Sequence, residues 1–409
     1  MRRRLEGARA LQGRPSKPGL HGRSRDELRA ASADGIFITE VESDPPPTER
    51  RLAVKDLFDT AGLRTTYGSA IFADHVPEET AESVRLLEAA GYVNIGKTNL
   101  HEFAYGVTSE NPHYGPVPNP RAAGRAAGGS SGGSAAALAA GLADAALGSD
   151  SAGSIRIPAA CCGIVGFKPT FGLVPIDGCF PLAPTFDHAG PMAREVSECK
   201  RMMQVLVTRF EPTDVELSEL RVGVAWLDEA DPLVRARVEK AAAHFPSREQ
   251  LALAVPNREE WGAAFRSEAL ECHAGLFPER ADDYGDDVRQ SLEAACELTD
   301  AEITAARRLR ERLREEVART LAPFDLLVTP TLPCVAPPYG QGTRTILTKL
   351  TALFNLTGWP ALAIPCGPAE QGLPASIQLA APAGQDALVL AAGAALERAL
   401  SQDEGHPNE

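Results

Sequence analysis

Residues 148–170 read GSDSAGSIRIPAACCGIVGFKPT. Small residues lead into Ser154, and branched side chains and a proline follow it, a pattern that predicts a sharp turn at the start of a helix. Such a turn presents one hydroxyl beside several backbone N–H groups. A serine hydroxyl is a weak nucleophile until a base takes its proton, yet no histidine lies between His113 and His188. The segment therefore indicates a reactive serine whose base must come from elsewhere.

Outward from this segment, strand-like and helix-like stretches alternate. A strand is expected at 51–59, a helix at 79–91 and a strand at 92–98. The other expected elements are a helix and a strand within 134–150, a helix and a strand within 155–170, a capped surface helix at 299–321, buried strands at 324–333, 360–368 and 375–382, and a closing helix at 387–400. No internal repeat or flexible linker separates them, so we expect one large α/β domain.

The composition narrows the range of partners. The 409 residues carry a net charge of −14, which argues against nucleic acid or an anionic membrane as the main partner. Eight cysteines occur without any C-x-x-C pair, and the adjacent Cys161 and Cys162 are interpreted as buried thiols. These features predict a reduced, cytoplasmic protein.

The two ends of the chain differ from the rest of the sequence in composition. Residues 1–29 hold nine Lys and Arg against three acidic residues, and no apolar segment follows them. We therefore predict a flexible basic arm rather than a secretory signal, with an Arg-rich transit peptide as the alternative. Residues 401–409 are predicted to be a polar tail. The Ala-rich stretch 134–147 is too short to span a bilayer and is interrupted by Asp144, so no membrane association is expected.

One stretch, GYVNIGKT (91–98), matches the phosphate-loop pattern G-x-x-x-x-G-K-[ST]. A phosphate loop needs a strand before its first glycine and a helix after its lysine. Here a predicted helix precedes Gly91, and the interior of the motif is strand-like. A P-loop nucleotide-binding protein therefore remains only a distant alternative.

A second stretch, GGSSG (128–132), matches the nucleophile-elbow pattern G-x-S-x-G at Ser130. Such an elbow sits on a strand-to-helix turn, and the preceding residues 119–127 lack the apolar run that a strand would need. An α/β-hydrolase-type esterase is thus a second distant alternative.

The sequence offers no metal site. No His, Cys or Asp cluster has metal-ligand spacing, and the acidic run 281–287 does not match a calcium loop, so we expect no metal and no cofactor.

Taken together, several segments strongly resemble the amidase signature family. Those that carry the resemblance are AVKDLFDTAG (53–62), GKTNLHEFAYG (96–106), GGSSGGSAAALAAG (128–141), residues 148–170, FDHAGPM (186–192), FDLLVTPTLP (324–333), NLTGWPALAIPCG (355–367) and GLPASIQL (372–379). The resemblance covers about residues 50–400. It implies a single large domain with a central, mixed, twisted β-sheet flanked by helices on both faces. The amidase domain is expected over 30–400, with a signature core at about 50–192 and a variable substrate region at about 206–300.

The resemblance also implies a catalytic triad of two serines and a lysine. Ser154 stands at the position of the family's nucleophile, Ser130 at that of a bridging serine in a cis peptide, and Lys55 at that of the base. A lysine normally holds its proton, with a pKa near 10.4, but burial penalises the cation and can lower the pKa by about 3–5 units. The apolar neighbours of Lys55 are suited to that environment.

The turn before Ser154 is expected to hold the oxyanion. Four consecutive backbone N–H groups are the candidates, those of Ser151, Ala152, Gly153 and Ser154. The family pattern D-T-G-G-S is D-S-A-G-S here, so Ala152 replaces a glycine. That exchange predicts either an ordinary backbone at Ala152 or a reshaped oxyanion site. Three further residues are expected to support the site rather than react, namely Ser131, Asp150 and Arg156.

Two functions share this triad. The first is an independent hydrolase that cleaves a carboxamide C–N bond and releases ammonia or an amine. The second is the glutaminase-type A subunit of a tRNA-dependent amidotransferase. The independent enzyme is favoured here, since the region before Lys55 lacks the long helical lead-in usual in that subunit. A non-catalytic binding protein is disfavoured because all three triad residues are present.

The substrate is expected to be a small-molecule amide whose identity the sequence does not reveal. Esters and carbamates are alternative substrate classes. Four aromatic residues of the variable region are candidates for an acyl pocket, with core packing as the equal alternative: Trp261, Phe265, Phe277 and Tyr284. Both a monomer and a homodimer are compatible with the sequence.

Overall fold

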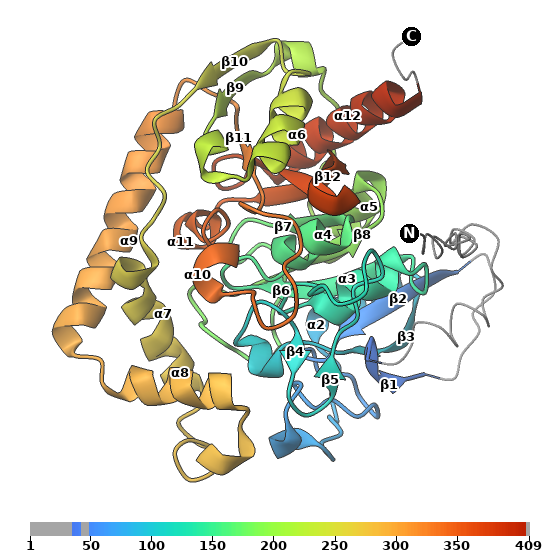
Figure 1. The fold of residues 1–409 in the computed structure, drawn as a ribbon. Coiled ribbons are helices and arrows are strands. Elements are labelled where there is room, and N and C mark those ends of the chain that lie inside the picture. Colours follow the sequence, from blue (N-terminus) through green and yellow to red (C-terminus); the bar gives the residue numbers. More distant parts are fainter. Residues whose placement is uncertain (1–34, 42–48, 406–409) are drawn as a thin grey trace, which may run out of the picture.

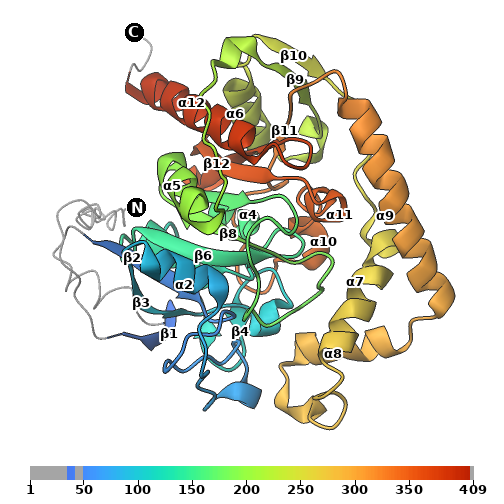
Figure 2. The same ribbon diagram turned by 180° about the vertical axis from the view of Figure 1, so that it is seen from behind.

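The computed structural model describes residues 35–41 and 49–405. They form an 11-stranded mixed β-sheet with helices on both faces, as expected (Figures 1 and 2). A separate two-stranded ribbon pairs β4 (Glu110–Asn111) with β5 (Gly115–Pro116). The predicted arm at 1–29 and the last residues of the polar tail, 406–409, lie outside the described residues.

One half of the sheet has the strand order β1-β3-β2-β6-β8-β7. These strands are β1 (Phe37–Glu40), β2 (Arg50–Lys55), β3 (Tyr92–Thr98), β6 (Ala145–Asp150), β7 (Val165–Lys168) and β8 (His188–Ala193). The strand β2 is parallel to both β3 and β6. It is shorter than the predicted strand 51–59, because the chain turns after Lys55. Lys55 and Asp150 are thereby the last residues of two neighbouring parallel strands, at the same edge of the sheet.

The other half continues in the order β12-β13-β11-β9-β10. Its strands are β9 (Arg221–Val224), β10 (Ser247–Gln250), β11 (Leu326–Pro330), β12 (Ala361–Pro368) and β13 (Pro374–Ala380). The antiparallel pair β12 and β13 joins the two halves, since β12 also pairs with β7. The predicted variable region 206–300 therefore contributes two strands, β9 and β10, to the central sheet as well as helices.

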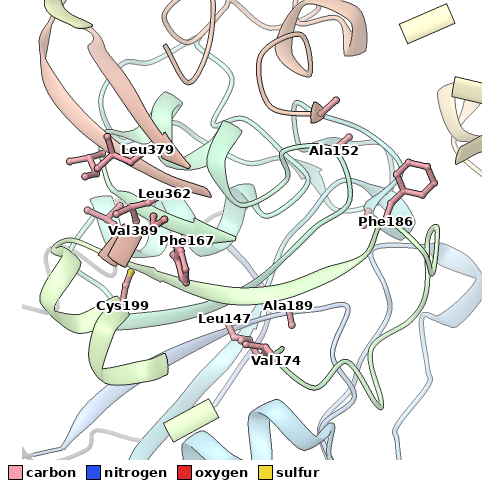
Figure 3. Packing of buried hydrophobic residues seen from close by; sticks show 14 of the residues in the cluster. Leu147, Ala152, Phe167, Val174, Phe186, Ala189, Cys199, Leu362, Leu379 and Val389 are labelled. Carbon is pink, nitrogen blue, oxygen red and sulfur yellow. The ribbon is translucent and has the colours of Figure 1, made fainter. Parts of the chain in front are cut away.

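Helices cover the two faces in separate groups. On one face lie α2 (Glu82–Ala89), α5 (Val196–Leu206) and α12 (Asp386–Gly405), seen from the front in Figure 2. Figure 3 shows how Leu362 and Leu379 of the sheet pack toward Val389 of α12 and Cys199 of α5. On the opposite face lie α3 (Gly132–Ala139), built mostly from small residues, and α4 (Arg156–Cys162).

A helical arm flanks this body (Figure 1). It consists of α7 (Arg258–Cys272), α8 (Asp286–Cys296) and α9 (Asp300–Leu321), and α9 begins with the expected cap at Thr299. The remaining helices are α6 (Pro232–Ala242), α10 (Arg344–Leu347) and α11 (Leu353–Thr357). Among the described residues, no helix is both long and apolar enough to cross a membrane.

Candidate active site

Lys55 lies at the C-terminal end of β2 and is completely buried. Its Nζ donates hydrogen bonds to Ser130 Oγ at 2.7 Å and to Ser149 Oγ at 2.8 Å. Burial lowers the pKa of Lys55 to about 7, against weaker opposing effects of Cys179 and of two carboxylates. A neutral amine near neutral pH is a competent proton acceptor.

Ser130 lies in the glycine-rich loop before α3, and the Gly129–Ser130 peptide bond is cis. The carbonyl of Ser130 accepts hydrogen bonds from His101 N and from Ser109 Oγ, each at 3.2 Å. A Cβ on Gly129 would come within 2.8 Å of Ser109 N, so no side chain fits at position 129. The glycine thus lets the 101–109 loop pack directly on the Ser130 backbone.

Ser131 joins this loop to the sheet. Its Oγ lies 3.2 Å from Ser149 O and 3.3 Å from Ser149 N, and its N–H donates to Ser154 O at 3.2 Å. One residue therefore connects the Ser130 loop, strand β6 and the turn that carries Ser154.

Ser154 lies two residues before the start of α4 and is 6% exposed. Its hydroxyl makes no hydrogen bond with the described residues, so the structure does not join Ser154 Oγ to Ser130 Oγ. The backbone of Gly153 has a φ of 134°, and a Cβ there would lie 2.3 Å from Thr351 Oγ1. Ala152, in contrast, does not enter the left-handed region. Of the two expectations for Ala152, the ordinary backbone is the one observed.

A buried ion pair holds this turn. Arg156 Nη2 donates to Asp150 Oδ1 at 2.9 Å and Arg156 Nε to Asp150 Oδ2 at 3.0 Å, with both side chains fully buried. Burial alone would raise the pKa of Asp150, but the Arg156 guanidinium holds that pKa far below its usual range. The guanidinium also donates to Gln378 Oε1 and Asn355 Oδ1, at 2.8 Å and 2.7 Å. The pair thus ties the Ser154 turn to the C-terminal part of the sheet.

One expectation for the oxyanion donors requires correction. The N–H of Gly153 donates to Asp150 Oδ1 at 2.7 Å, so it is not available to a substrate. The N–H groups of Ser151, Ala152 and Ser154 make no hydrogen bond with other described residues. The sequence alone did not reveal this difference, because it depends on where the Asp150 side chain folds back.

The histidine next to this turn is occupied by backbone contacts. His188 Nδ1 lies 2.7 Å from Phe186 O and 3.2 Å from Asp150 O. Burial, followed by the charge of Lys168, moves the pKa of His188 well below its usual value. Its neighbour Asp187 instead accepts the Ser151 hydroxyl at 2.5 Å. The two residues form no dyad, as their adjacency in an extended chain suggested.

Several polar residues at the site were not singled out from the sequence. Ser149 is the second acceptor of Lys55, and Thr351 Oγ1 donates to Ala152 O at 2.6 Å. Ser149 could have been found from strand pairing, because β6 is parallel to β2 and Val54 pairs with Leu147. Thr351 gave no local signal, since 199 positions of the chain separate it from Ala152.

The four aromatic residues of the variable region are all buried. Phe265 packs against Phe186 and Tyr105, with ring centroids 5.4 and 6.1 Å apart. Phe277 and Tyr284 pack against each other, at 6.1 Å. Trp261, by contrast, lines a cavity beside the helical arm. No group of three or more potential metal-ligating side chains occurs within residues 35–41 and 49–405.

Comparisons with known proteins agree with this architecture. The Amidase family model matches residues 51–390. The A subunit of glutamyl-tRNA(Gln) amidotransferase from Koribacter versatilis is 33% identical, with 92% of this chain and 90% of that protein covered. The AtzE subunit of 1-carboxybiuret hydrolase from Pseudomonas sp. strain ADP is 35% identical, with 91% and 89% covered.

Solved structures agree as well. A crystal structure described as an amidase superposes with a TM-score of 0.84 at 33% identity, covering 92% of this chain and 94% of that one. The structure of 6-aminohexanoate cyclic dimer hydrolase gives a TM-score of 0.80 at 26% identity, with 92% of each chain covered. On the matched sequence and the shared fold, this chain belongs to the amidase family.

Proposed function

We propose that this chain hydrolyses a carboxamide C–N bond through an acyl-enzyme on Ser154, with Lys55 as the base and Ser130 as the proton relay. The observation that carries the proposal is the fully buried Lys55, whose Nζ lies 2.7 Å from Ser130 Oγ and whose pKa is about 7. Membership of the amidase family supports the reaction class.

In the proposed acylation step, neutral Lys55 accepts the proton of Ser130, and Ser130 Oγ accepts that of Ser154. The oxygen of Ser154 then forms a bond to the carbonyl carbon of the amide. When the tetrahedral intermediate collapses, the C–N bond breaks and the proton returns through Ser130 to the departing nitrogen. Water enters by the reverse route and releases the carboxylic acid.

The proposed oxyanion site consists of the N–H groups of Ser151, Ala152 and Ser154. Gly153 is left out because Asp150 accepts its N–H. Preorganised backbone donors of this kind stabilise the charge that develops on the carbonyl oxygen, and losing one typically costs about 10²–10³ in kcat. Asp150 and Arg156 act by fixing the turn.

We further propose that residues 30–400 act as one amidase domain, with substrate selectivity in 206–300, in a reducing compartment such as the cytoplasm. All eight cysteines are free thiols, which fits that compartment. A glutaminase-type subunit is the second candidate, because similar relatives include amidotransferase A subunits. Ammonia release from glutamine that requires added partner subunits would favour this candidate over an independent enzyme.

The decisive experiment is covalent labelling. A fluorophosphonate probe followed by peptide mapping should place the adduct on Ser154, and Ser154→Ala should abolish both the adduct and ammonia release from a panel of aliphatic, aromatic and amino-acid amides. An adduct on Ser130 or Ser131 instead would overturn the assignment and favour the nucleophile-elbow interpretation.

A further inference from the structure

The 101–109 loop, which carries both hydrogen-bond donors to the Ser130 carbonyl, has an unusual backbone conformation. Phe103, Ala104 and Ser109 have φ values of 49°, 58° and 58°, in the left-handed region that residues with side chains seldom adopt. Such conformations persist only where the surrounding structure imposes them. The contacts that fix this loop therefore also fix the Ser130 carbonyl.

Two neighbouring residues of the loop attach it to the start of α8 in the helical arm. His101 Nε2 donates to Asp287 Oδ2 at 2.6 Å, because an ionised carboxylate can only accept. Glu102 Oε2 accepts the N–H of Gly285, the residue before α8, at 2.8 Å. These contacts span 186 and 183 positions of the chain. The helical arm thus reaches the loop that holds Ser130.

The His101 ring is closely confined. Its side chain is 6% exposed, and a Cβ on Gly106 would lie 2.0 Å from its Nε2, so the ring fills the space that a side chain at position 106 would need. Its Nδ1 has no hydrogen-bond partner among the described residues, which leaves Asp287 as the acceptor that orients the ring. Burial would raise the pKa of Asp287, but the hydrogen bond and charge of His101, with the charge of Arg344, lower that pKa overall. The contact is therefore a charge-assisted hydrogen bond, one of the stronger kinds.

His101 joins the arm to Ser130 through a single residue. Its side chain is held by Asp287, and its main-chain N–H donates to the Ser130 carbonyl at 3.2 Å. The Oγ of the same serine lies 2.7 Å from Lys55 Nζ. A shift of the His101 backbone would therefore move the Ser130 carbonyl, and with it the hydroxyl of the proposed relay. A misplacement of about 1 Å can cost about 100-fold in rate.

We propose that His101, held by Asp287 of the helical arm, is a positioning residue for Ser130. The inference rests on the proposed function and adds the residue pair that sets the place of its proton relay. His101 moves no proton in this scheme, because its Nε2 is engaged by Asp287 and its backbone N–H by Ser130. The region 206–300, which contains α8, thus contributes to the placement of the relay as well as to the proposed selectivity.

Two substitutions remove the contact from its opposite ends. His101→Leu deletes the donor, and Asp287→Ala deletes the acceptor at a side chain that is 49% exposed. Each should lower kcat for the fastest amide of the panel by about 10-fold and change KM by less than about twofold, because the relay moves and the substrate contacts do not. His101→Gln, which keeps a donor near the Nε2 position, should recover part of the loss. The control is His244→Leu, which breaks a histidine–carboxylate pair with Asp403, at 3.4 Å, and should keep the wild-type kcat.

A double-mutant cycle shows whether His101 acts through Ser130. In Ser130→Ala protein the relay is absent, so the further change His101→Leu should lower the residual kcat by less than about twofold. Two losses that multiply would mean that His101 only supports the fold, and would overturn the inference. Wild-type kcat in folded His101→Leu and Asp287→Ala proteins would also overturn it, and would leave the proposed function standing.

Hydrogen exchange measures the placement of the Ser130 loop without any turnover. The N–H groups of Ser131 and Gly132 donate to Ser154 O and Ser109 Oγ, so their exchange rates report on the order of this loop. In the Asp287→Ala protein, segment 128–134 should exchange about 10-fold faster than in the wild type.

This measurement separates the inference from the proposed chemistry. Faster exchange of segment 128–134 in Asp287→Ala, together with wild-type activity of Ser130→Ala, would support the positioning contact and count against the proposed relay. Exchange at the wild-type rate would overturn the inference whatever the activity. If His101→Leu does not fold, as judged by thermal unfolding, Asp287→Ala takes its place in the double-mutant cycle.

Discussion

At the scale of single residues, Lys55 determines what the proposed site can do. It is a buried amine whose Nζ contacts two hydroxyls and no carboxylate among the described residues. Its apolar neighbours in the sequence are suited to a buried lysine but do not by themselves predict burial, and its proposed role came from the family resemblance. Ser149 was missed because its side chain meets Lys55 only when β2 and β6 are aligned. Strand register, more than residue type, brings those two groups together.

Removing the amine should remove the base. Lys55→Ala is expected to lower the acylation rate by about 10²–10⁴-fold while the protein stays folded. In the wild type, kcat/KM should rise with pH as Lys55 loses its proton near pH 7, and this limb should vanish in the variant. Stopped-flow measurements of acylation from about pH 5 to about pH 9, on both sides of the pKa of Lys55, test both effects.

Two controls make that result specific. Lys240→Ala removes an exposed lysine on α6 and should leave the rate unchanged. His188→Ala removes the histidine next to the Ser154 turn and should change the rate far less than Lys55→Ala. Near-native hydrolysis by folded Lys55→Ala, together with an inactive but folded His188→Ala, would refute the lysine mechanism.

Burial of Lys55 should also lower the free energy of unfolding of the protein. Lowering the pKa of Lys55 from 10.5 to about 7 corresponds to about 5 kcal/mol. Below pH 7 both the folded and unfolded states carry the proton, so the full cost applies, and above pH 10.5 neither does and the cost disappears. We therefore expect Lys55→Met to increase the free energy of unfolding at about pH 7, by an amount that shrinks as the pH rises to about 10. Urea denaturation at both pH values would show the trend, and an equal or lower stability of the variant near neutral pH would contradict it.

At the scale of elements, the turn between β6 and α4 is the part on which the site depends. The residue pattern predicted a turn and a helix start correctly, and Arg156 and Asp150 were expected to pin it. What the pattern could not predict is that Asp150 accepts the Gly153 N–H, and that Thr351 contacts both Ala152 and Gly153. Such contacts arise from tertiary packing rather than from local sequence.

Two substitutions in this turn should have very different effects on stability and activity. Gly153→Ala places a Cβ at a φ of 134° and 2.3 Å from Thr351 Oγ1, so we expect a loss of about 2–5 kcal/mol in stability and of most activity. Ala152→Gly restores the family residue where the backbone is ordinary, and should change stability by about 1 kcal/mol or less. Thermal unfolding and labelling of Ser154 in both variants provide the comparison. If both variants unfold at the same temperature and label Ser154 equally, the turn accepts a Cβ at Gly153 and the predicted clash with Thr351 is wrong.

At the scale of the whole molecule, the buried Asp150–Arg156 pair connects the two halves of the sheet. Arg156→Met should cost about 3–5 kcal/mol because it leaves the Asp150 carboxylate buried without its partner. The carboxylate of the wild type, with its depressed pKa, contributes stability above its unfolded pKa of about 4 that is lost as the pH falls below that value. The deficit of the variant relative to wild type should therefore be largest near neutral pH and smaller in acid.

Chemical denaturation of the wild type, Arg156→Met and the double variant Asp150→Asn/Arg156→Met tests this account. The double variant removes the uncompensated charge and should recover part of the loss. A double variant that is less stable than Arg156→Met at neutral pH would show that other contacts of Asp150 outweigh the ion pair.

Much of the whole-molecule architecture could be predicted from the sequence. The alternation of strands and helices predicted the α/β class, and the family resemblance supplied the single mixed sheet. Neither β9 nor β10 was predicted. The strand β10 (Ser247–Gln250) consists of exposed polar residues at the sheet edge, so no apolar pattern marks it. The strand β9 is mostly buried between β10 and β11, but its four residues are too few to show a period of their own.

The contact between Arg156 and Gln378 spans 222 positions of the chain, which has a consequence for biosynthesis. At about 5–20 residues per second, a ribosome needs roughly 11–44 s to add the intervening residues. Throughout that interval Lys55, Ser130 and Ser154 have all been made, but the Gln378 side chain that accepts from Arg156 does not yet exist. A nascent chain therefore carries the three residues of the proposed triad before the Gln378 acceptor for Arg156 exists. The turn gains this acceptor only when β13 has left the ribosome.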